Sequence, residues 1–148
     1  MIKFLNDNLA EPFVRIKESY KKAASKNQQS IDAITISSFD ANKGEVNSRF
    51  VNLKIIDNQD FIFFSNYESP KSFEFESHNQ ISAVIYWSKI NTQIRMKAKI
   101  KKTSKAFNNN YFKSRSPEKN ALAISSNQSS KIDSYQEILE KYNFAKKT

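Results

Sequence analysis

The chain has 148 residues, and its 24 lysine and arginine residues against 15 acidic residues give a net charge of +9. With 39% hydrophobic and 13% aromatic residues it can bury a core, which excludes global disorder and indicates one domain over residues 1–148. The absence of cysteine excludes disulfides and thiolate sites. The sequence has no apolar run near the ~20 residues of a membrane span and no signal-peptide core, so we expect a cytoplasmic protein with no membrane partner.

The positive charge favours anionic partners, which include nucleic acids, phosphorylated small molecules and membrane surfaces. A lysine-rich chain with one glycine is equally typical of a genome with biased base content. Charge alone therefore leaves the class of partner open.

Hydrophobic periodicity predicts a helix over residues 11–26, with Phe13, Ile16 and Tyr20 on one face and Pro12 in the first turn. Two strands follow within residues 32–56. The turn between them contains the only glycine, Gly44, where a positive φ is easiest.

A third strand is predicted at 60–66 and a short helix at 69–79, with two further strands at 80–87 and 91–102. A helix at 103–114 and a loop at 115–130 come next. A closing helix at 131–144 has an apolar face of Ile132, Tyr135, Ile138, Leu139 and Tyr142. Short connections favour antiparallel pairing, so the expected fold class is α+β, mainly β, a small barrel with flanking helices.

An abrupt change of pattern occurs in FIFFSNYESPKSFEF, residues 61–75, where an apolar strand stops at Ser65 and a helix begins at Ser69-Pro70. Ser69 suits the N-cap and Pro70 the first helical position. A helix N-terminus with a serine hydroxyl and the Lys71 ammonium would also bind a phosphate. Ordinary capping explains the serine and the proline equally well, so both interpretations stay open.

Two cations, Arg49 and Lys54, lie in the apolar strand SRFVNLK. A charge in a buried strand is costly unless it is paired or faces a ligand. Strict alternation places Arg49 with Val51 and Leu53 but Lys54 on the other face, so both reach one pocket only through a bulge or a second subunit. A half-exposed edge strand is the alternative.

A stripe of basic residues follows one face of the strand at 91–102: Gln93, Arg95, Lys97, Lys99 and Lys101. Solvation and protection of a sheet edge explain such a stripe, and a basic nucleic-acid-binding domain is a disfavoured alternative, because no nucleic-acid motif accompanies it. The single histidine, His78, has no carboxylates at metal-ligand spacing, so no metal site is expected.

Five stretches in order resemble one family. SRFVNLK is similar to an Arg-x-Val-x-x-Lys strand, FFSNYESPKS to a Tyr-Thr-Asn-x-x-Ser-Arg-Lys turn, YFKSRS to Tyr-Phe-x-Ser-Arg-Pro and SSNQSS to Ser-x-Gln-Ser-Ser, while Gln93 falls where a flavin-contacting glutamine is expected. From about Glu11 to Tyr142 the chain thus resembles the pyridoxamine 5′-phosphate oxidase family. The resemblance implies a flavoprotein with an FMN-binding split β-barrel, which acts as a homodimer with FMN at the subunit interface.

The resemblance also implies site residues. Those for FMN are Arg49, Val51, Lys54, Ser65, Ser69, Lys71, Gln93, Gln128 and Ser129, and those for the phosphate of a vitamin B6 substrate are Lys54, Tyr111 and Arg115. The implied reaction moves a hydride from a phosphorylated amine or alcohol, such as pyridoxamine or pyridoxine 5′-phosphate, to flavin N5, and dioxygen reoxidises the flavin. The flavin carries the chemistry, so no catalytic side chain is assigned.

Several positions depart from the family pattern. Pro70 stands where an arginine is usual, Phe64 replaces a tyrosine, Ser116 replaces a proline and Lys119 replaces a substrate-binding serine. The sequence ends after the last predicted helix, whereas typical members continue into strands that supply a tryptophan, arginines and a histidine. We therefore expect FMN binding more firmly than oxidation of pyridoxamine phosphate. An FMN-binding module without oxidase activity is the alternative, and a deazaflavin or heme in place of FMN is a further one.

Overall fold

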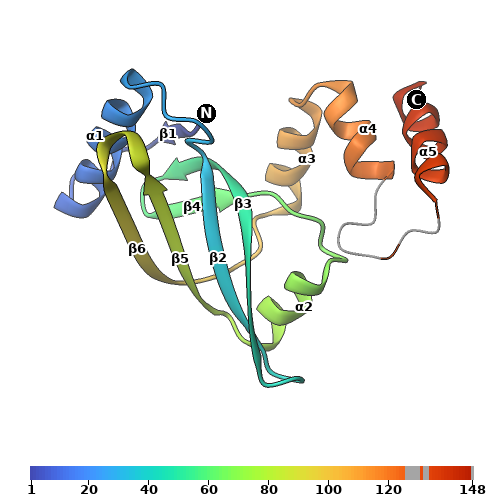
Figure 1. Ribbon diagram of the computed structural model, residues 1–148, viewed down its shortest axis with the longest axis horizontal. Coiled ribbons are helices and arrows are strands. Elements are labelled where there is room, and N and C mark those ends of the chain that lie inside the picture. The colour runs from blue at the N-terminus through green and yellow to red at the C-terminus, as the bar shows by residue number, and fades with distance from the viewer. Residues whose placement is uncertain (126–130, 132–133, 148) are drawn as a thin grey trace. The chain divides into compact units, whose positions relative to one another are not determined.

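The computed structural model describes residues 1–125, 131 and 134–147 (Figure 1). It divides into two compact units. The first comprises residues 1–65 and 74–100, and the second comprises residues 66–73 with the described part of 101–148. Within the described residues no helix is long and apolar enough to cross a membrane.

The first unit is built on a six-stranded sheet. Its elements are β1 (Lys3–Leu5), α1 (Glu11–Ser25), β2 (Ala33–Asp40), β3 (Glu45–Asp57), β4 (Asp60–Phe63), β5 (Gln80–Trp87), the 3₁₀ turn η1 (Ser88–Ile90) and β6 (Thr92–Lys99). Helix α2 (Pro70–Ser77) begins in the second unit and ends in the first. Its first residue is Pro70, as the sequence predicted.

The strands lie in the order β1-β3-β2-β5-β6, and β4 also pairs with β3 (Figure 1). Antiparallel pairing is confirmed for β2–β3, β3–β4, β2–β5 and β5–β6. The prediction missed β1, which pairs with β3 in parallel. A strand of three residues is too short to be detected from hydrophobic periodicity. A tertiary contact holds it in place: the buried Ile2, which directly precedes the strand, donates its backbone N–H to the hydroxyl of Tyr20 at 2.9 Å.

The predicted hairpin between β2 and β3 is confirmed. Its register runs from Ala33 opposite Asn52 to Asp40 opposite Glu45. Gly44 closes the turn with φ +68°, and its N–H donates to the Asp40 carbonyl at 2.9 Å. A positive φ is energetically unfavourable for a residue that has a Cβ. The single glycine therefore lies where the backbone requires it.

The core of the first unit lies between the sheet and α1. Alternate residues of β5 are buried, and Trp87 at the end of that strand is 1% exposed. The Trp87 indole N–H donates to the Ile31 carbonyl at 3.0 Å, and the Tyr20 ring of α1 lies 6.0 Å from its ring. This confirms the predicted face of α1, on which Phe13 and Ile16 are half-buried.

Strand β6 has the two faces that its alternation predicted. Ile94 and Met96 pack against the core, whereas Gln93, Arg95 and Lys97 are exposed. The chain enters β6 through η1 and Asn91, which has φ +49°. The basic stripe is therefore a solvated face of the sheet.

The second unit contains α3 (Lys105–Lys113), α4 (Pro117–Ser125) and α5 (Tyr135–Lys147). Helix α3 was predicted, and the Ser104 hydroxyl caps it by accepting from the Phe107 N–H at 3.2 Å. The prediction of a loop at 115–130 was wrong for residues 117–125. Pro117 occupies the first position of α4, where no N–H is needed.

The closing helix starts later and ends later than predicted. Residue 131 is not helical, and α5 begins at Tyr135 after Ser134, whose hydroxyl accepts from the Glu137 N–H at 3.1 Å. On the predicted apolar face Ile138 and Tyr142 are half-buried, whereas Tyr135 is 75% exposed. Ile132, which was assigned to the same face, lies outside the described residues.

Candidate functional site

The turn before α2 is organised around Asn66, within the second unit. The Asn66 carbonyl accepts from the Ser69 hydroxyl at 2.6 Å, from the Ser69 N–H at 3.3 Å and from the Ser72 hydroxyl at 3.0 Å. The Asn66 side-chain oxygen accepts from the Glu68 N–H at 2.8 Å. These bonds fix the start of α2 relative to the turn. Sequence reasoning assigned no role to Asn66 or Ser72.

A buried cation completes this turn. The Lys71 ammonium donates to the Ser69 hydroxyl at 2.9 Å, and Ser69, Lys71 and Ser72 are 1%, 6% and 6% exposed. Burial of an ammonium is costly, so a buried lysine needs polar neighbours. The ammonium lies at a helix N-terminus, a combination that fits a phosphate group, while the two hydroxyls donate to the Asn66 carbonyl. The capping interpretation and the phosphate-binding interpretation of residues 61–75 are thus compatible, because the turn at the start of α2 also holds the Lys71 ammonium. We call Asn66, Ser69, Lys71 and Ser72 the α2 cluster.

Arg49 takes part in a buried polar network in the first unit. Its Nη2 lies 2.7 Å from Oε2 of Glu74, and its Nη1 donates to the Ser38 hydroxyl. The Ser38 hydroxyl also bonds to Glu74, and the Asn47 side-chain amide donates to Oε1 of Glu74 at 3.1 Å. Glu74 is 6% exposed and Ser38 is 2% exposed. The network joins the β2–β3 hairpin to α2 at Glu74.

Lys54 has a different acidic partner, Asp32, at the start of β2. Its Nζ lies 2.6 Å from Oδ2 of Asp32, and the N-terminal ammonium of Met1 lies 3.8 Å from the same oxygen. The pairing of β3 with β4 shifts register between Leu53 and Ile55, which leaves Lys54 as the extra residue of a bulge. Bulges re-aim a side chain relative to strict alternation. Arg49 and Lys54 are therefore held in two separate ion pairs.

The pKa of the Asp32 carboxyl is lowered. Burial by itself raises this pKa, but the hydrogen bond and the charge of Lys54, with the N-terminal ammonium, outweigh the effect of burial. Asp32 is consequently an anion at neutral pH, and the Lys54 ammonium has a charged partner.

The remaining residues of the first unit that were assigned to FMN lie at different places in the sheet. Gln93 is exposed and lies opposite Tyr86, whereas Val51 lies opposite the buried Ile34 and packs against the core. Ser65 is half-buried and follows the end of β4. Gln93 and Val51 are thus on opposite faces of the sheet.

The two residues assigned to a substrate phosphate on α3 and after it, Tyr111 and Arg115, lie close in the chain of the second unit. The Tyr111 carbonyl accepts from the Ser114 hydroxyl at 2.7 Å. The Arg115 guanidinium donates to the Lys119 carbonyl at 2.8 Å and lies 5.7 Å from the Phe112 ring centre. Both side chains are half-buried. Gln128 and Ser129 lie outside the described residues.

His78 is exposed, and its Nδ1 lies 3.2 Å from the Gln80 carbonyl and its ring 5.7 Å from that of Phe39. No group of three or more histidine, cysteine or acidic side chains placed to hold a metal ion occurs in the part of the chain that the structure describes.

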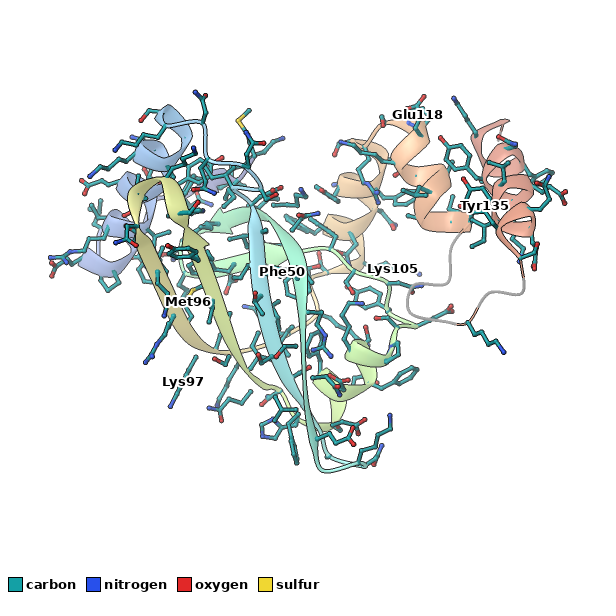
Figure 2. The ribbon with its side chains drawn as sticks, viewed as in Figure 1. Phe50, Met96, Lys97, Lys105, Glu118 and Tyr135 are labelled. Carbon is teal, nitrogen blue, oxygen red and sulfur yellow. The ribbon has the colours of Figure 1, made fainter. Side chains whose placement is uncertain are left out.

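Figure 2 shows the side chains of the described residues, with Phe50 on β3 and Lys97 on β6 among those labelled. Phe50 is 76% exposed. It lies opposite Thr35 of β2, and Thr35 lies opposite Val84 of β5. Since Val84 in turn lies opposite Arg95, the outward face of the sheet combines apolar and basic side chains.

Comparison with known proteins identifies the family of the chain. A family model described as "Pyridoxamine 5′-phosphate oxidase" matches residues 20–141. A pyridoxine/pyridoxamine 5′-phosphate oxidase of Burkholderia cenocepacia is 32% identical over 128 residues, which are 86% of this chain and 59% of the relative. One from a Nostoc species is 33% identical over 129 residues, 87% of this chain and 59% of the relative. The chain thus spans about 59% of the length of these relatives.

Two solved structures share the fold. PhzG from Burkholderia lata, in complex with tetrahydrophenazine-1-carboxylic acid, matches with a TM-score of 0.87 at 20% identity and covers 95% of this chain and 69% of that chain. A pyridoxamine 5′-phosphate oxidase-related, FMN binding protein from Nostoc punctiforme matches with a TM-score of 0.70 at 12% identity and covers 89% of this chain and 72% of that chain. The α+β fold is therefore the FMN-binding split β-barrel, and the chain belongs to the pyridoxamine 5′-phosphate oxidase family.

Proposed function

We propose that this protein is an FMN-dependent oxidoreductase. The observation that carries the proposal is the α2 cluster, in which the Lys71 ammonium, 6% exposed, donates to the Ser69 hydroxyl at a helix N-terminus. An ammonium at a helix N-terminus suits a phosphate, and the family is one of flavoproteins. The FMN phosphate is the anion that we assign to the α2 cluster.

When bound, FMN supplies the redox chemistry by accepting a hydride from the substrate. The protein contributes binding and orientation. Besides the α2 cluster, the side chains proposed to contact FMN are those of Arg49, Val51, Lys54, Ser65, Gln93, Gln128 and Ser129. Residues 1–148 act in this proposal as one domain.

For the substrate we propose a small phosphorylated amine or alcohol, with pyridoxamine and pyridoxine 5′-phosphate as the first compounds to test. Relatives named pyridoxine/pyridoxamine 5′-phosphate oxidase support this class of substrate. Lys54, Tyr111 and Arg115 would contact the substrate phosphate. Two of these three side chains are cations, which suits a phosphate dianion.

We further propose a homodimer with FMN at the subunit interface, located in the cytoplasm. The exposed Phe50 and Tyr86, 76% and 58% exposed, lie on the sheet face that also carries Gln93 and support an interface there. Nucleic acid is not a partner in this proposal, because no nucleic-acid motif accompanies the basic residues of β6.

A second candidate is an FMN-binding protein that does not oxidise pyridoxamine phosphate. The Nostoc punctiforme neighbour is named only as a related FMN binding protein, and PhzG is in complex with a carboxylic acid that bears no phosphate in its name. Turnover with pyridoxamine 5′-phosphate separates the two candidates.

The first experiment is an absorption spectrum of the purified protein before and after incubation with FMN and removal of the excess by gel filtration. Retention of about one FMN per chain supports the proposal, and steady-state oxygen consumption with pyridoxamine 5′-phosphate then tests the substrate. A protein that retains no FMN after reconstitution contradicts both candidates. Riboflavin under the same conditions is the control, because it lacks the phosphate that the α2 cluster is proposed to bind.

A further inference from the structure

Lys54 forms an ion pair with a carboxylate of its own chain. Its Nζ lies 2.6 Å from Oδ2 of Asp32, and the two side chains are 30% and 18% exposed. Both groups retain contact with solvent, so a ligand has access to the same ammonium. The Arg49–Glu74 pair differs, because its carboxylate is only 6% exposed and is bonded on both oxygens.

The backbone holds Asp32 firmly in this position. Its carbonyl accepts from the Leu53 N–H at 2.7 Å, which extends the β2–β3 ladder by one bond. On one side Ile31 accepts from the buried Trp87, and on the other Ala33 donates to the Ser30 carbonyl at 2.9 Å. The backbone of Asp32 is therefore fixed, and its carboxylate stays within side-chain reach of Lys54.

The charge of Asp32 changes how strongly the Lys54 ammonium attracts an anion. Asp32 is ionised at neutral pH, because its carboxyl has a lowered pKa. An anion that contacts Lys54 is attracted by the ammonium and repelled by Asp32, and both energies grow in proportion to the anion's charge. A phosphate monoester carries a charge of about −1.5 to −2 at pH 7, so the repulsion from Asp32 removes more binding free energy from a phosphate than from a carboxylate. The N-terminal ammonium, 92% exposed and 3.8 Å away, is screened by solvent.

We infer that Asp32 is a specificity-determining residue, which weakens the hold of Lys54 on anions and reduces the advantage that a doubly charged phosphate has at Lys54 over a group with a single negative charge, such as a carboxylate. The inference rests on the proposed function, in which Lys54 contacts the substrate. Asp32 acts through Lys54 and takes no part in hydride transfer.

The test compares three ligands on the FMN-loaded full chain by calorimetry: pyridoxamine 5′-phosphate, its analogue with a carboxymethyl group in place of the phosphate, and pyridoxamine. Asp32→Asn keeps the size of the side chain and removes its charge. We expect this variant to bind the phosphate ligand about tenfold more tightly and the carboxylate ligand about threefold more tightly, with pyridoxamine unchanged. Asp32→Ser is the second variant if the asparagine variant folds poorly.

Asp7→Asn is the matched control. Asp7 also pairs with a lysine, Lys17, at 2.5 Å in the same unit, so the substitution removes one charge without touching Lys54. It should leave all three affinities unchanged. A gain in phosphate affinity as large in Asp7→Asn as in Asp32→Asn would overturn the inference, because net charge would then explain it.

Lys54→Met separates failure of the inference from failure of the proposed function. If Lys54→Met loses phosphate affinity but Asp32→Asn does not gain it, Asp32 only positions the lysine and the inference is overturned, while the proposed function stands. If Lys54→Met binds the phosphate ligand as well as the wild-type protein does, Lys54 is not the substrate contact, and the inference and that part of the proposed function both fail.

Discussion

Arg49 on β3 and Glu74 on α2 are paired through Nη2 and Oε2 at 2.7 Å, although they lie 25 residues apart in the chain. The guanidinium is 23% exposed and the carboxylate 6% exposed. The pair attaches α2 to the β2–β3 hairpin. In this position Glu74 both neutralises Arg49 and fixes where its guanidinium lies.

Glu74→Ala should be strongly destabilising. It leaves Arg49 and Ser38 without their shared acceptor, and breaking a buried ion pair in this way costs about 3–5 kcal/mol of unfolding free energy. Urea unfolding followed by circular dichroism measures the loss. Arg15→Ala is the control, because the Arg15–Glu11 pair is about three-quarters exposed on both sides and such pairs contribute at most about 1 kcal/mol. A similar cost for the two variants would contradict the role given to Glu74.

Lys71→Met should weaken the binding of FMN while leaving the fold intact. The variant keeps the length of the side chain and removes the ammonium that donates to Ser69. Loss of one charge-assisted hydrogen bond to a phosphate should raise the FMN dissociation constant about 10- to 100-fold. Quenching of flavin fluorescence measures it. Riboflavin affinity should not change, and the exposed Lys97→Met is the control. Equal losses for both flavins would show that Lys71 does not contact the phosphate.

Asp32 should make stability depend on pH in the acid range. Because its pKa is lower in the folded state, the carboxylate contributes stability above its unfolded pKa of about 4, and this contribution is lost as the pH falls through the folded pKa. The difference in unfolding free energy between the wild-type protein and Asp32→Asn should therefore be constant from about pH 7 to pH 5 and shrink below about pH 4. Urea unfolding at several pH values measures it, and a difference that grows on acidification would contradict the ion pair.

Gly44→Ala should destabilise the β2–β3 hairpin through backbone conformation alone. Gly44 has φ +68°, and a Cβ placed there meets nothing within 4 Å. The expected cost is about 1–2 kcal/mol, the penalty for the left-handed region. Gly44→Asn should cost less, since asparagine tolerates this conformation better. Thermal unfolding compares the three proteins, and an equal cost for alanine and asparagine would point to another cause.

Phe50→Asp tests the proposed homodimer. Phe50 is 76% exposed on the outward sheet face, and burial of a charge at a subunit interface opposes association. Light scattering after gel filtration should show the mass of a single chain for this variant and of two chains for the wild-type protein. Leu9→Asp is the control, because Leu9 is 87% exposed outside the sheet. A wild-type protein with the mass of one chain would refute the dimer.

The sequence by itself determined the elements whose signals are local. The alternation of β6, the apolar face of α1, the positive φ at Gly44 and the start of α2 at Pro70 are each properties of neighbouring residues. The order and spacing of the short motifs also indicated the family and therefore the fold. Local signals misled at α4, where proline marks a helix start as readily as a loop.

Only the tertiary structure decided which charges meet. Lys54 and Asp32 are 22 residues apart and Arg49 and Glu74 are 25 apart, so no local pattern links them. The register of β2 on β3 and the bulge at Lys54 bring the first pair together, and the fold of α2 back to the hairpin brings the second pair together. The sequence could name the cations because an isolated charge in an apolar strand is conspicuous. It could not name their partners, because pairing depends on sheet register, which is set by the packing of the whole core.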